Sequence, residues 1–219
     1  MPGWYTRAVV TRGAVMSTTH LILIRHGQIQ ANLDKRWHGW TDSALTDMGI
    51  TQAERVAERL HKEHPDISAL YASPLQRTFN TAQKIADILQ LEVITEPRIK
   101  EYGIGVWEGE TFSDLHSKFN FFQQVNANPD YAPEQGESIA AVGDRVSTAL
   151  QSFLSRHPGE KVVAVSHGAA MALGLAGLLD KDWYAWNKYQ FLNTSVTELA
   201  LGLEPKLLRL NCVEHLAGL

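Results

Sequence analysis

Two short apolar segments, each followed by a histidine and then a glycine, constrain the fold of this chain most. Residues 20–25 precede His26, and residues 161–166 precede His167. Apolar runs of this length, rich in β-branched residues, are typical of strands that are buried on both faces of a parallel sheet. Open α/β sheets bind ligands in the crevice beyond the carboxyl ends of their strands. We therefore expect an α/β fold in which both imidazoles face one crevice.

The remainder of the chain alternates between strand and helix patterns. Further strand patterns cover residues 69–72, 92–95, 195–202 and 206–213, and helix patterns cover residues 46–60, 74–89, 139–154 and 169–179. Thr46 is the expected N-cap of the first helix, and Pro74 is expected to open the second. This alternation predicts a three-layer αβα sandwich with a mainly parallel central sheet, and the last two strands predict a closing hairpin.

The stretch at about residues 103–135 does not fit this alternation. It is rich in aromatic side chains, and a connection of this length within a compact domain usually has a function. We expect a small helical lid inserted above the sheet. Residues 18–219 are then expected to form a single domain, with residues 1–17 as a loose N-terminal extension. Whether Met1 or Met16 is the true start is left open.

Composition and charge argue against several classes of protein. A hydrophobic content of 44% with 20% charged residues is typical of a globular core rather than of disorder. The net charge of −4 disfavours nucleic-acid binding. The apolar run at 162–179 is long enough for a membrane span, but Ser166, His167 and Gly168 interrupt it, so we expect no membrane partner. The single cysteine, Cys212, cannot form a disulfide within the chain, which favours a cytoplasmic protein.

Two arginines accompany the two histidines. Arg25 adjoins His26, and Arg77 follows the end of another predicted strand. A single histidine after a buried strand is more often a structural residue than a catalyst, and arginines near helix ends are more often exposed charges. Because all of these residues follow strand ends of one predicted sheet, their combination favours a functional site.

The sequence resembles the histidine phosphatase superfamily, which contains the phosphoglycerate mutases and many small phosphatases. The resemblance runs in order from about Thr18 to Asn211. The motifs that carry it are Arg25-His26-Gly27, Asn32, Gly39-Trp40-Thr41-Asp42, Leu45-Thr46 with Gly49, Ser73 to Thr78 with Thr81-Ala82, Glu101-Tyr102-Gly103, Trp107-Glu108-Gly109, Gly136-Glu137-Ser138 and Ser166-His167-Gly168. Each motif alone is weak, but the ordered set is specific.

The resemblance implies a role for each matching residue. His26 would attack phosphorus and become a phosphohistidine, while Arg25, Arg77 and His167 would bind the phosphoryl oxygens. Glu101, at the end of its own predicted strand region, would protonate the leaving alkoxide and later accept a proton from water. The residues that would line the phosphate pocket are Asn32, His38, Gly39 and Gly168. No metal or other cofactor is implied, because a loose phosphoryl transition state mainly requires positioning and neutralisation of charge.

The predicted lid favours a phosphatase over a mutase. Between residues 110 and 135 it has one basic side chain other than histidine, Lys118, and five aromatic ones. A phosphoglycerate mutase must hold a doubly anionic intermediate, which requires additional cations. We therefore predict a metal-independent phosphomonoesterase that acts on small phosphate esters through a phosphohistidine intermediate.

Two other functions stay open at this point. Residues 36–40 are similar to the mutase loop at that position, so a phosphoglycerate mutase is the second hypothesis. An inactive phospholigand-binding module is the third, and it is disfavoured because all five catalytic matches are intact. The sequence does not choose among sugar phosphates, nucleotides, ribazole phosphates and small acid phosphates as substrates, and it does not indicate an oligomeric state.

Overall fold

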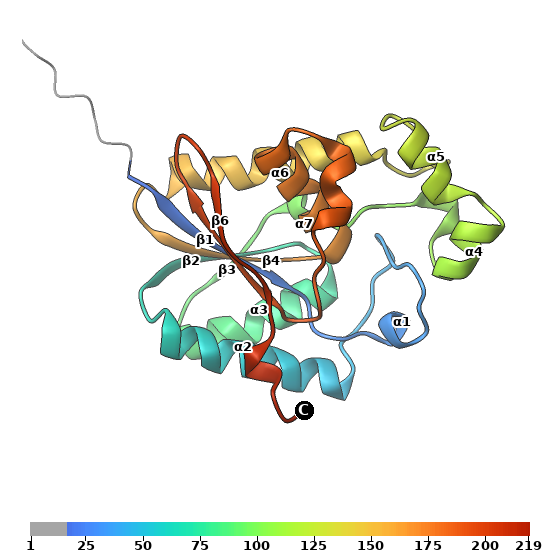
Figure 1. The fold of residues 1–219 in the computed structure, drawn as a ribbon. Helices are drawn as coiled ribbons and strands as arrows, with labels where there is room; N and C mark the ends of the chain where they lie inside the picture. Colours follow the sequence, from blue (N-terminus) through green and yellow to red (C-terminus); the bar gives the residue numbers. More distant parts are fainter. Residues whose placement is uncertain (1–16) are drawn as a thin grey trace, which may run out of the picture.

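The computed structural model describes residues 17–219, and at its centre is a six-stranded sheet with the strand order β3-β2-β4-β1-β5-β6 (Figure 1). The strands are β1 (Thr19–Arg25), β2 (Ile67–Ala72), β3 (Val93–Thr95), β4 (Lys161–Ser166), β5 (Val196–Leu201) and β6 (Lys206–Cys212). Apart from Ser17, the expected N-terminal extension and the two possible start residues lie outside the described residues.

The sheet is mixed, with four parallel strands. β1 pairs with β4, β4 with β2, and β2 with β3, all in parallel, whereas β5 is antiparallel to both β1 and β6. The predicted closing hairpin is thus confirmed. Arg25 at the end of β1 is in register with Ser166 at the end of β4. The residues that follow these two strands, His26 and His167, therefore emerge side by side at one edge of the sheet.

Helices cover both faces of the sheet (Figure 1). The long helices are α2 (Asp47–Glu63) and α3 (Gln76–Leu89) on one face, and α6 (Ile139–Arg156) and α7 (Gly168–Leu175) on the other. Successive side chains of β1 point to opposite faces, so that Ile22 joins the core beneath α2 and α3 while Leu23 joins the core beneath α6 and α7. Both are fully buried. The predicted α/β fold with three layers is confirmed.

The starts of the two helices on the first face depend on local chemistry. Thr46 caps α2 as predicted, because its Oγ1 accepts a hydrogen bond from Gly49 N at 3.0 Å. The prediction that Pro74 opens α3 is wrong. The helix begins two residues later because Leu75 has extended backbone angles, with φ −70° and ψ 138°. Arg77 consequently lies in the first turn of α3, directly after the end of β2.

The apolar run at residues 162–179 forms two elements rather than one. It is divided between β4 and α7, and α7 is shorter than predicted because a π-helical turn, Ala176–Asp180, replaces its last part. A β-carbon at Gly177 would come within 2.0 Å of the Trp183 ring, so glycine permits the close approach of Trp183, which packs against the core. Within residues 17–219 no helix combines the length and the apolar character needed to cross a membrane.

The predicted lid contains two short helices, α4 (Phe112–Ser117) and α5 (Phe121–Ala127), which stand above the strand ends at one side of the molecule (Figure 1). Leu115, Phe121 and Val125 are fully buried and belong to the same core as α6 and α7. The aromatic side chains that mark this segment in the sequence thus attach the lid to the rest of the fold.

Candidate active site

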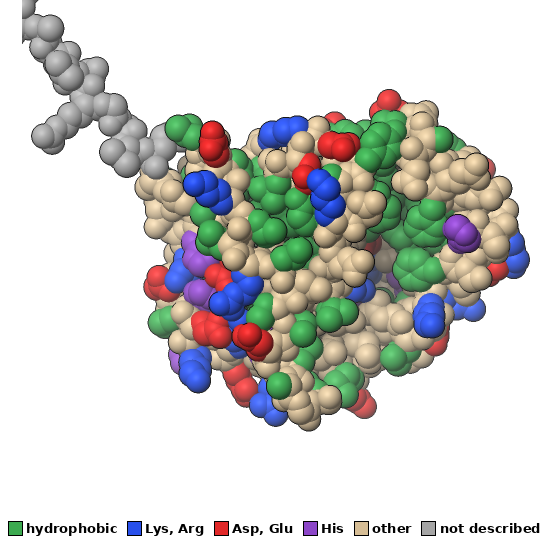
Figure 2. Space-filling view, in the orientation of Figure 1, with side chains coloured by type: hydrophobic (Ala, Val, Ile, Leu, Met, Phe, Trp, Pro, Cys, Tyr) green, Lys and Arg blue, Asp and Glu red, His purple; other side chains and the backbone are tan. Residues whose placement is uncertain are grey.

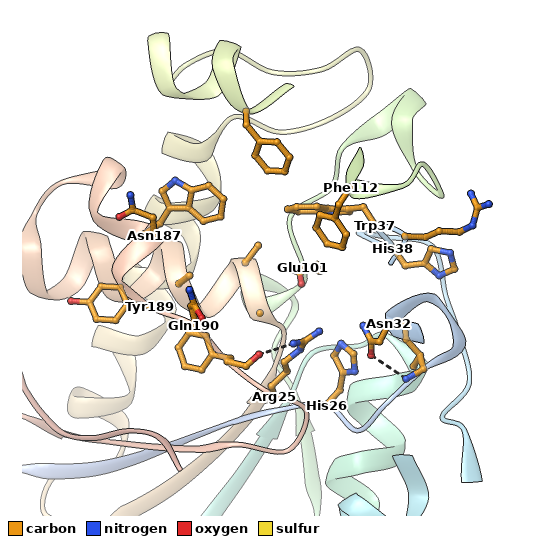
Figure 3. A pocket seen from close by; sticks show the side chains of 18 residues that line it. Arg25, His26, Asn32, Trp37, His38, Glu101, Phe112, Asn187, Tyr189 and Gln190 are labelled. Atoms are coloured by element: carbon orange, nitrogen blue, oxygen red, sulfur yellow. Dashed lines mark hydrogen bonds between the residues drawn. The ribbon is translucent and has the colours of Figure 1, made fainter. Parts of the chain in front are cut away.

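A cavity of about 590 Å³ lies at the carboxyl ends of β1 and β4. Figure 2 shows the surface hollowed beside the lid, and Figure 3 shows the cavity from close by. We call Arg25, His26, Asn32 and Gly168 the floor of the cavity, and Trp37, Phe112, Phe122 and Trp186 its roof. Glu101 and His38 line the wall between them. Six of the nine site residues predicted from the sequence therefore line one cavity.

His26 is fixed in a single tautomer. Its backbone N donates to Ser166 O at 3.0 Å, which continues the pairing of β1 with β4 by one residue. Its ring Nδ1 lies 2.7 Å from Gly27 O. Because a carbonyl oxygen can only accept, Nδ1 carries the proton, and in the neutral ring Nε2 keeps its lone pair. Among residues 17–219, no group forms a hydrogen bond with Nε2 of His26. This nitrogen is therefore available to a ligand.

Burial keeps the His26 ring neutral. The side chain is 3% exposed, and loss of hydration lowers its pKa well below the usual value of 6.5, with the positive charges of Arg77 and then Arg25 acting in the same direction. A neutral imidazole with a free lone pair is the form that can attack an electrophile.

We expect NMR to detect this state directly. At pH 6.5, where an ordinary histidine is half protonated, the His26 ring should be neutral and protonated on Nδ1, because its pKa is lowered. Long-range ¹⁵N–¹H correlation spectra of protein labelled in histidine report both properties, and His26→Ala identifies the signals. A His26 imidazolium at pH 6.5 would contradict the structural argument.

His167 lies behind His26, with 5.3 Å between the ring centroids. It is fully buried and does not line the cavity. Its Nδ1 accepts a hydrogen bond from Arg77 Nε at 3.2 Å, so its Nε2 carries the proton and donates to Ser73 Oγ at 2.8 Å. Burial, followed by the charge of Arg77, lowers the pKa of His167 well below 6.5.

Arg77 is also buried behind the cavity, with no exposed surface. Its Nη2 donates to the carbonyls of His38 and Gly39 at 3.0 and 2.8 Å, and its Nη1 donates to Thr41 O at 2.9 Å. Together with the bond to His167, four of its five N–H groups are used by the protein. Arg77 therefore ties the loop that contains His38 to the first turn of α3, and one of its N–H groups has no partner among the described residues.

Arg25 has more free donors than Arg77. Its Nη1 donates to Phe191 O at 2.6 Å, which fixes the guanidinium against the C-terminal part of the chain. Its Nε is buried and has no hydrogen-bond partner among the described residues. A β-carbon at position 168 would lie 3.6 Å from this nitrogen, so Gly168 leaves the approach to it open. A buried guanidinium with an unpaired N–H beside a neutral imidazole is well suited to bind an anion.

Glu101 reaches the cavity from a different segment than predicted. The prediction placed it at a strand end, but β3 ends at Thr95 and a 3₁₀ turn, Pro97–Ile99, intervenes. Its Oε1 accepts from Tyr102 N at 2.9 Å and from Ala170 N, in the first turn of α7, at 2.8 Å. No group in the described part of the chain donates to Oε2. In Figure 3, Glu101 lies between Arg25 and the roof residues Trp37 and Phe112.

Comparison with known proteins identifies the family. The model of the histidine phosphatase superfamily (branch 1) matches residues 21–212. The chain belongs to this superfamily. The relatives of this histidine phosphatase include a probable phosphoglycerate mutase GpmB of Proteus mirabilis, which is 34% identical over 179 residues that cover 81% of this chain and 82% of the relative. Phosphoserine phosphatase 1 of Hydrogenobacter thermophilus is 37% identical over 164 residues, covering 74% and 77% of the two chains.

Solved structures of the superfamily share the whole fold. The crystal structure of a phosphoserine phosphatase from Entamoeba histolytica in complex with 3-phosphoglyceric acid has a TM-score of 0.82 at 34% identity, covering 90% of this chain and 99% of that one. A mycobacterial glucosyl-3-phosphoglycerate phosphatase has a TM-score of 0.80 at 27% identity. This histidine phosphatase is therefore an enzyme of the phosphatase or mutase type, as the sequence indicated.

The other predicted pocket residues of this histidine phosphatase differ in their placement. Asn32 lies in the short helix α1 (Gln30–Leu33) and lines the floor, while the Nδ1 of His38 in the wall lies 2.7 Å from Ser43 Oγ. Gly39 does not line the cavity; its N donates to Glu108 Oε2 at 2.8 Å. Its role in phosphate binding stays a prediction.

The sequence reasoning missed two groups of residues at the cavity. Asn193 Nδ2 donates to His26 O at 3.0 Å and to Asn32 Oδ1 at 3.1 Å, which connects the floor to the loop that precedes β5. The second group is Trp186, Asn187, Tyr189, Gln190 and Phe191, all of which line the cavity. The cluster of aromatic residues ahead of the final hairpin was the available signal for the second group.

Proposed function

We propose that this histidine phosphatase is a phosphomonoesterase that works through a phosphohistidine at Nε2 of His26. The observation that carries the proposal is the hydrogen bond between His26 Nδ1 and Gly27 O, because it leaves a neutral nucleophilic nitrogen at the floor of the cavity. The two guanidinium groups near it supply positive charge for the phosphoryl oxygens.

The reaction then has two displacements at phosphorus. In the first, Nε2 of His26 forms a bond to phosphorus and the bond to the ester oxygen breaks. The electron pair stays on that oxygen, which takes a proton from Oε2 of Glu101. In the second, a water oxygen bonds to phosphorus, the bond to Nε2 breaks, and the proton of the water returns to Glu101. The N–H on Nδ1 of His26 stays in place throughout.

Arg25, Arg77 and His167 contribute in different ways to binding the phosphoryl oxygens. Arg25 offers its free Nε together with Nη2, so it can bind two phosphoryl oxygens as a planar fork. Arg77 contributes one N–H, and its main effect is to hold His167 and the loop at residues 38–41. His167 Nε2, which here donates to Ser73 Oγ, becomes a third donor when it turns to a phosphoryl oxygen.

The cavity favours substrates with an apolar or neutral leaving group. Apart from histidines, its basic side chains are Arg25 and Arg36, and Arg36 Nη1 already donates to Gly109 O at 2.7 Å. Lys118, the single basic residue of the predicted lid segment, is 67% exposed and pairs with Asp114 at 2.8 Å. Four aromatic rings form the roof, which suits an aryl or alkyl group better than a second phosphate.

A mutase is the second candidate, supported by the presence of Arg36 in the cavity wall and by the probable phosphoglycerate mutase among the relatives. A mutase must return the phosphoryl group to the bound product before that product leaves. The roof of this cavity would then have to hold a doubly charged anion for the time of the transfer.

One experiment separates these functions. The protein is incubated, with a chelator present, with 4-nitrophenyl phosphate in one arm and with 3-phosphoglycerate plus bisphosphoglycerate in another, and the products are followed by ³¹P NMR. We expect release of inorganic phosphate in the first arm, with an acid-labile phosphoenzyme after rapid quenching. Faster interconversion of phosphoglycerates than hydrolysis would indicate the mutase. Phosphate binding without turnover over a broad panel of esters would indicate a binding module.

A further inference from the structure

The side chain of Arg145 in α6 donates all five of its N–H groups within the protein. Nε and Nη2 form a bidentate pair with Glu137 at 2.7 Å each. Nη1 donates to two backbone carbonyls, Arg98 O at 2.8 Å and Lys100 O at 2.7 Å, and the second N–H of Nη2 donates to Glu101 O at 2.8 Å. The side chain is 19% exposed, so these bonds are partly shielded from water.

The three carbonyls belong to the irregular segment that carries Glu101. Arg98 lies in the 3₁₀ turn Pro97–Ile99, and Lys100 and Glu101 lie between this turn and a second one, Gly105–Trp107; none of the three pairs with a strand of the described sheet. Glu137 Oε2 also accepts from Gly103 N at 3.2 Å. The pair of Arg145 and Glu137 therefore binds the backbone on both sides of Glu101.

The opposite face of the segment is held by Trp40, which lies in the loop after His38. Trp40 Nε1 donates to Glu101 O at 2.9 Å, so this carbonyl is shared between Trp40 and Arg145. The Glu101 carboxyl itself is fixed only through Oε1, by two backbone N–H groups. The direction of Oε2 consequently depends on where the backbone of residue 101 lies. Among residues 17–219, Arg145 is the one side chain that donates to three carbonyls of this segment, those of residues 98, 100 and 101.

We propose that Arg145, oriented by Glu137, is the positioning residue for Glu101 as proton donor to the leaving group. The inference rests on the proposed function. Lysine cannot replace arginine in this role, because a single ammonium group has three donors at one point, whereas the planar guanidinium spans a carboxylate and three carbonyls at once. A misplacement of about 1 Å in a catalytic group can reduce a rate about 100-fold.

The test compares two esters that differ in their need for a proton. 4-Nitrophenolate is a weakly basic leaving group that departs without protonation, whereas the alkoxide released from benzyl phosphate is strongly basic; both substrates carry one aromatic ring and one phosphate. We expect Arg145→Lys to reduce kcat/KM for benzyl phosphate about 10- to 100-fold and that for 4-nitrophenyl phosphate less than about threefold. A purely structural role would reduce both equally.

Glu101→Gln is measured in parallel and separates the proton-donor role of Glu101 from the positioning role of Arg145. This variant should also lose more activity toward benzyl phosphate than toward 4-nitrophenyl phosphate, with kcat/KM for benzyl phosphate reduced about 10²- to 10⁴-fold. If Glu101→Gln shows no such selectivity, the proton-donor role in the proposed function is wrong. If Glu101→Gln shows it and Arg145→Lys does not, only the positioning role is overturned.

Arg156→Lys is the matched control. Arg156 lies on the same helix and pairs with the buried Glu96 at 3.2 Å. Unlike Arg145, it donates no hydrogen bond to the backbone carbonyls of residues 98–101. It should leave the ratio of the two kcat/KM values unchanged. If Arg145→Lys does not fold, Glu137→Gln, which weakens the pair while Arg145 is kept, should shift the ratio in the same direction, and an unchanged ratio in that variant overturns the proposal.

Discussion

His26→Ala is expected to reduce kcat/KM for 4-nitrophenyl phosphate by at least about 10⁴-fold, because removal of the nucleophile in a covalent mechanism abolishes the pathway and leaves only the contribution of binding and charge. The acid-labile phosphoenzyme should disappear at the same time. The side chain makes one hydrogen bond, to Gly27 O, so the substitution should disturb little besides the ring itself. Steady-state kinetics and rapid quenching with alkali, in which phosphohistidine is stable, measure the two effects.

His61→Ala is a suitable control for this prediction. His61 lies on the exposed side of α2 and contributes nothing to the cavity, so its loss should leave kcat/KM within about twofold, in line with the small effects of surface substitutions. Activity of His26→Ala within tenfold of the parent protein, or a phosphoenzyme formed on another residue, would require a different nucleophile.

Arg25→Lys is expected to reduce kcat/KM by about 100-fold, although the positive charge is retained. The loss of one preorganised donor to a transition-state oxygen costs about 10²- to 10³-fold in comparable sites, and lysine cannot reproduce the fork of Nε and Nη2. The buried, unpaired Nε is the donor whose loss should matter most. Inhibition by inorganic phosphate should weaken in parallel, which competitive inhibition measurements will show.

Arg36→Lys is the matched substitution in the cavity wall. Arg36 is exposed and already donates to Gly109 O, so the same change there should alter kcat/KM for an aryl phosphate only a few-fold. Equal losses in the two variants would mean that the fork at Arg25 has no special part in catalysis.

The sequence was sufficient to predict the pairing of the two histidines. The reason is geometric: apolar runs of five or six residues predict buried parallel strands, and the ends of such strands share an edge of the sheet. His26 and His167 needed no further information. The placement of Arg25 and Arg77 near this edge of the sheet was likewise predictable, because Arg25 ends β1 and Arg77 follows the end of β2.

Contacts between distant segments could not be predicted in this way. Arg77 has fewer free N–H groups than Arg25 because it donates to carbonyls of the loop at residues 38–41. The sequence around Arg77 does not show that this loop lies against it. The same holds for Arg145, which is 44 residues from Glu101 in the chain. A helix pattern shows which face of α6 is apolar, but it does not show which backbone carbonyls a polar side chain on that helix will meet.

The prediction for Glu101 was wrong in its structural part for a related reason. A strand end was assumed because Val93–Thr95 has a strand pattern, whereas Pro97 begins a 3₁₀ turn that separates the strand from the carboxylate. Proline has no backbone N–H and a fixed φ, so it stops strand pairing and favours the start of a turn.

The floor and the roof of the cavity come from different kinds of structure. Arg25 and His26 are attached to the central sheet, while Phe112, Phe122 and Trp186 come from short helical segments that contribute no strand to it. Replacement of the roof residues should therefore alter which alcohol or phenol is accepted without moving the atoms that transfer phosphorus. Such a separation allows an ancestral catalyst to diversify toward new metabolites by changes in a few surface helices, while selection continues to preserve its chemistry.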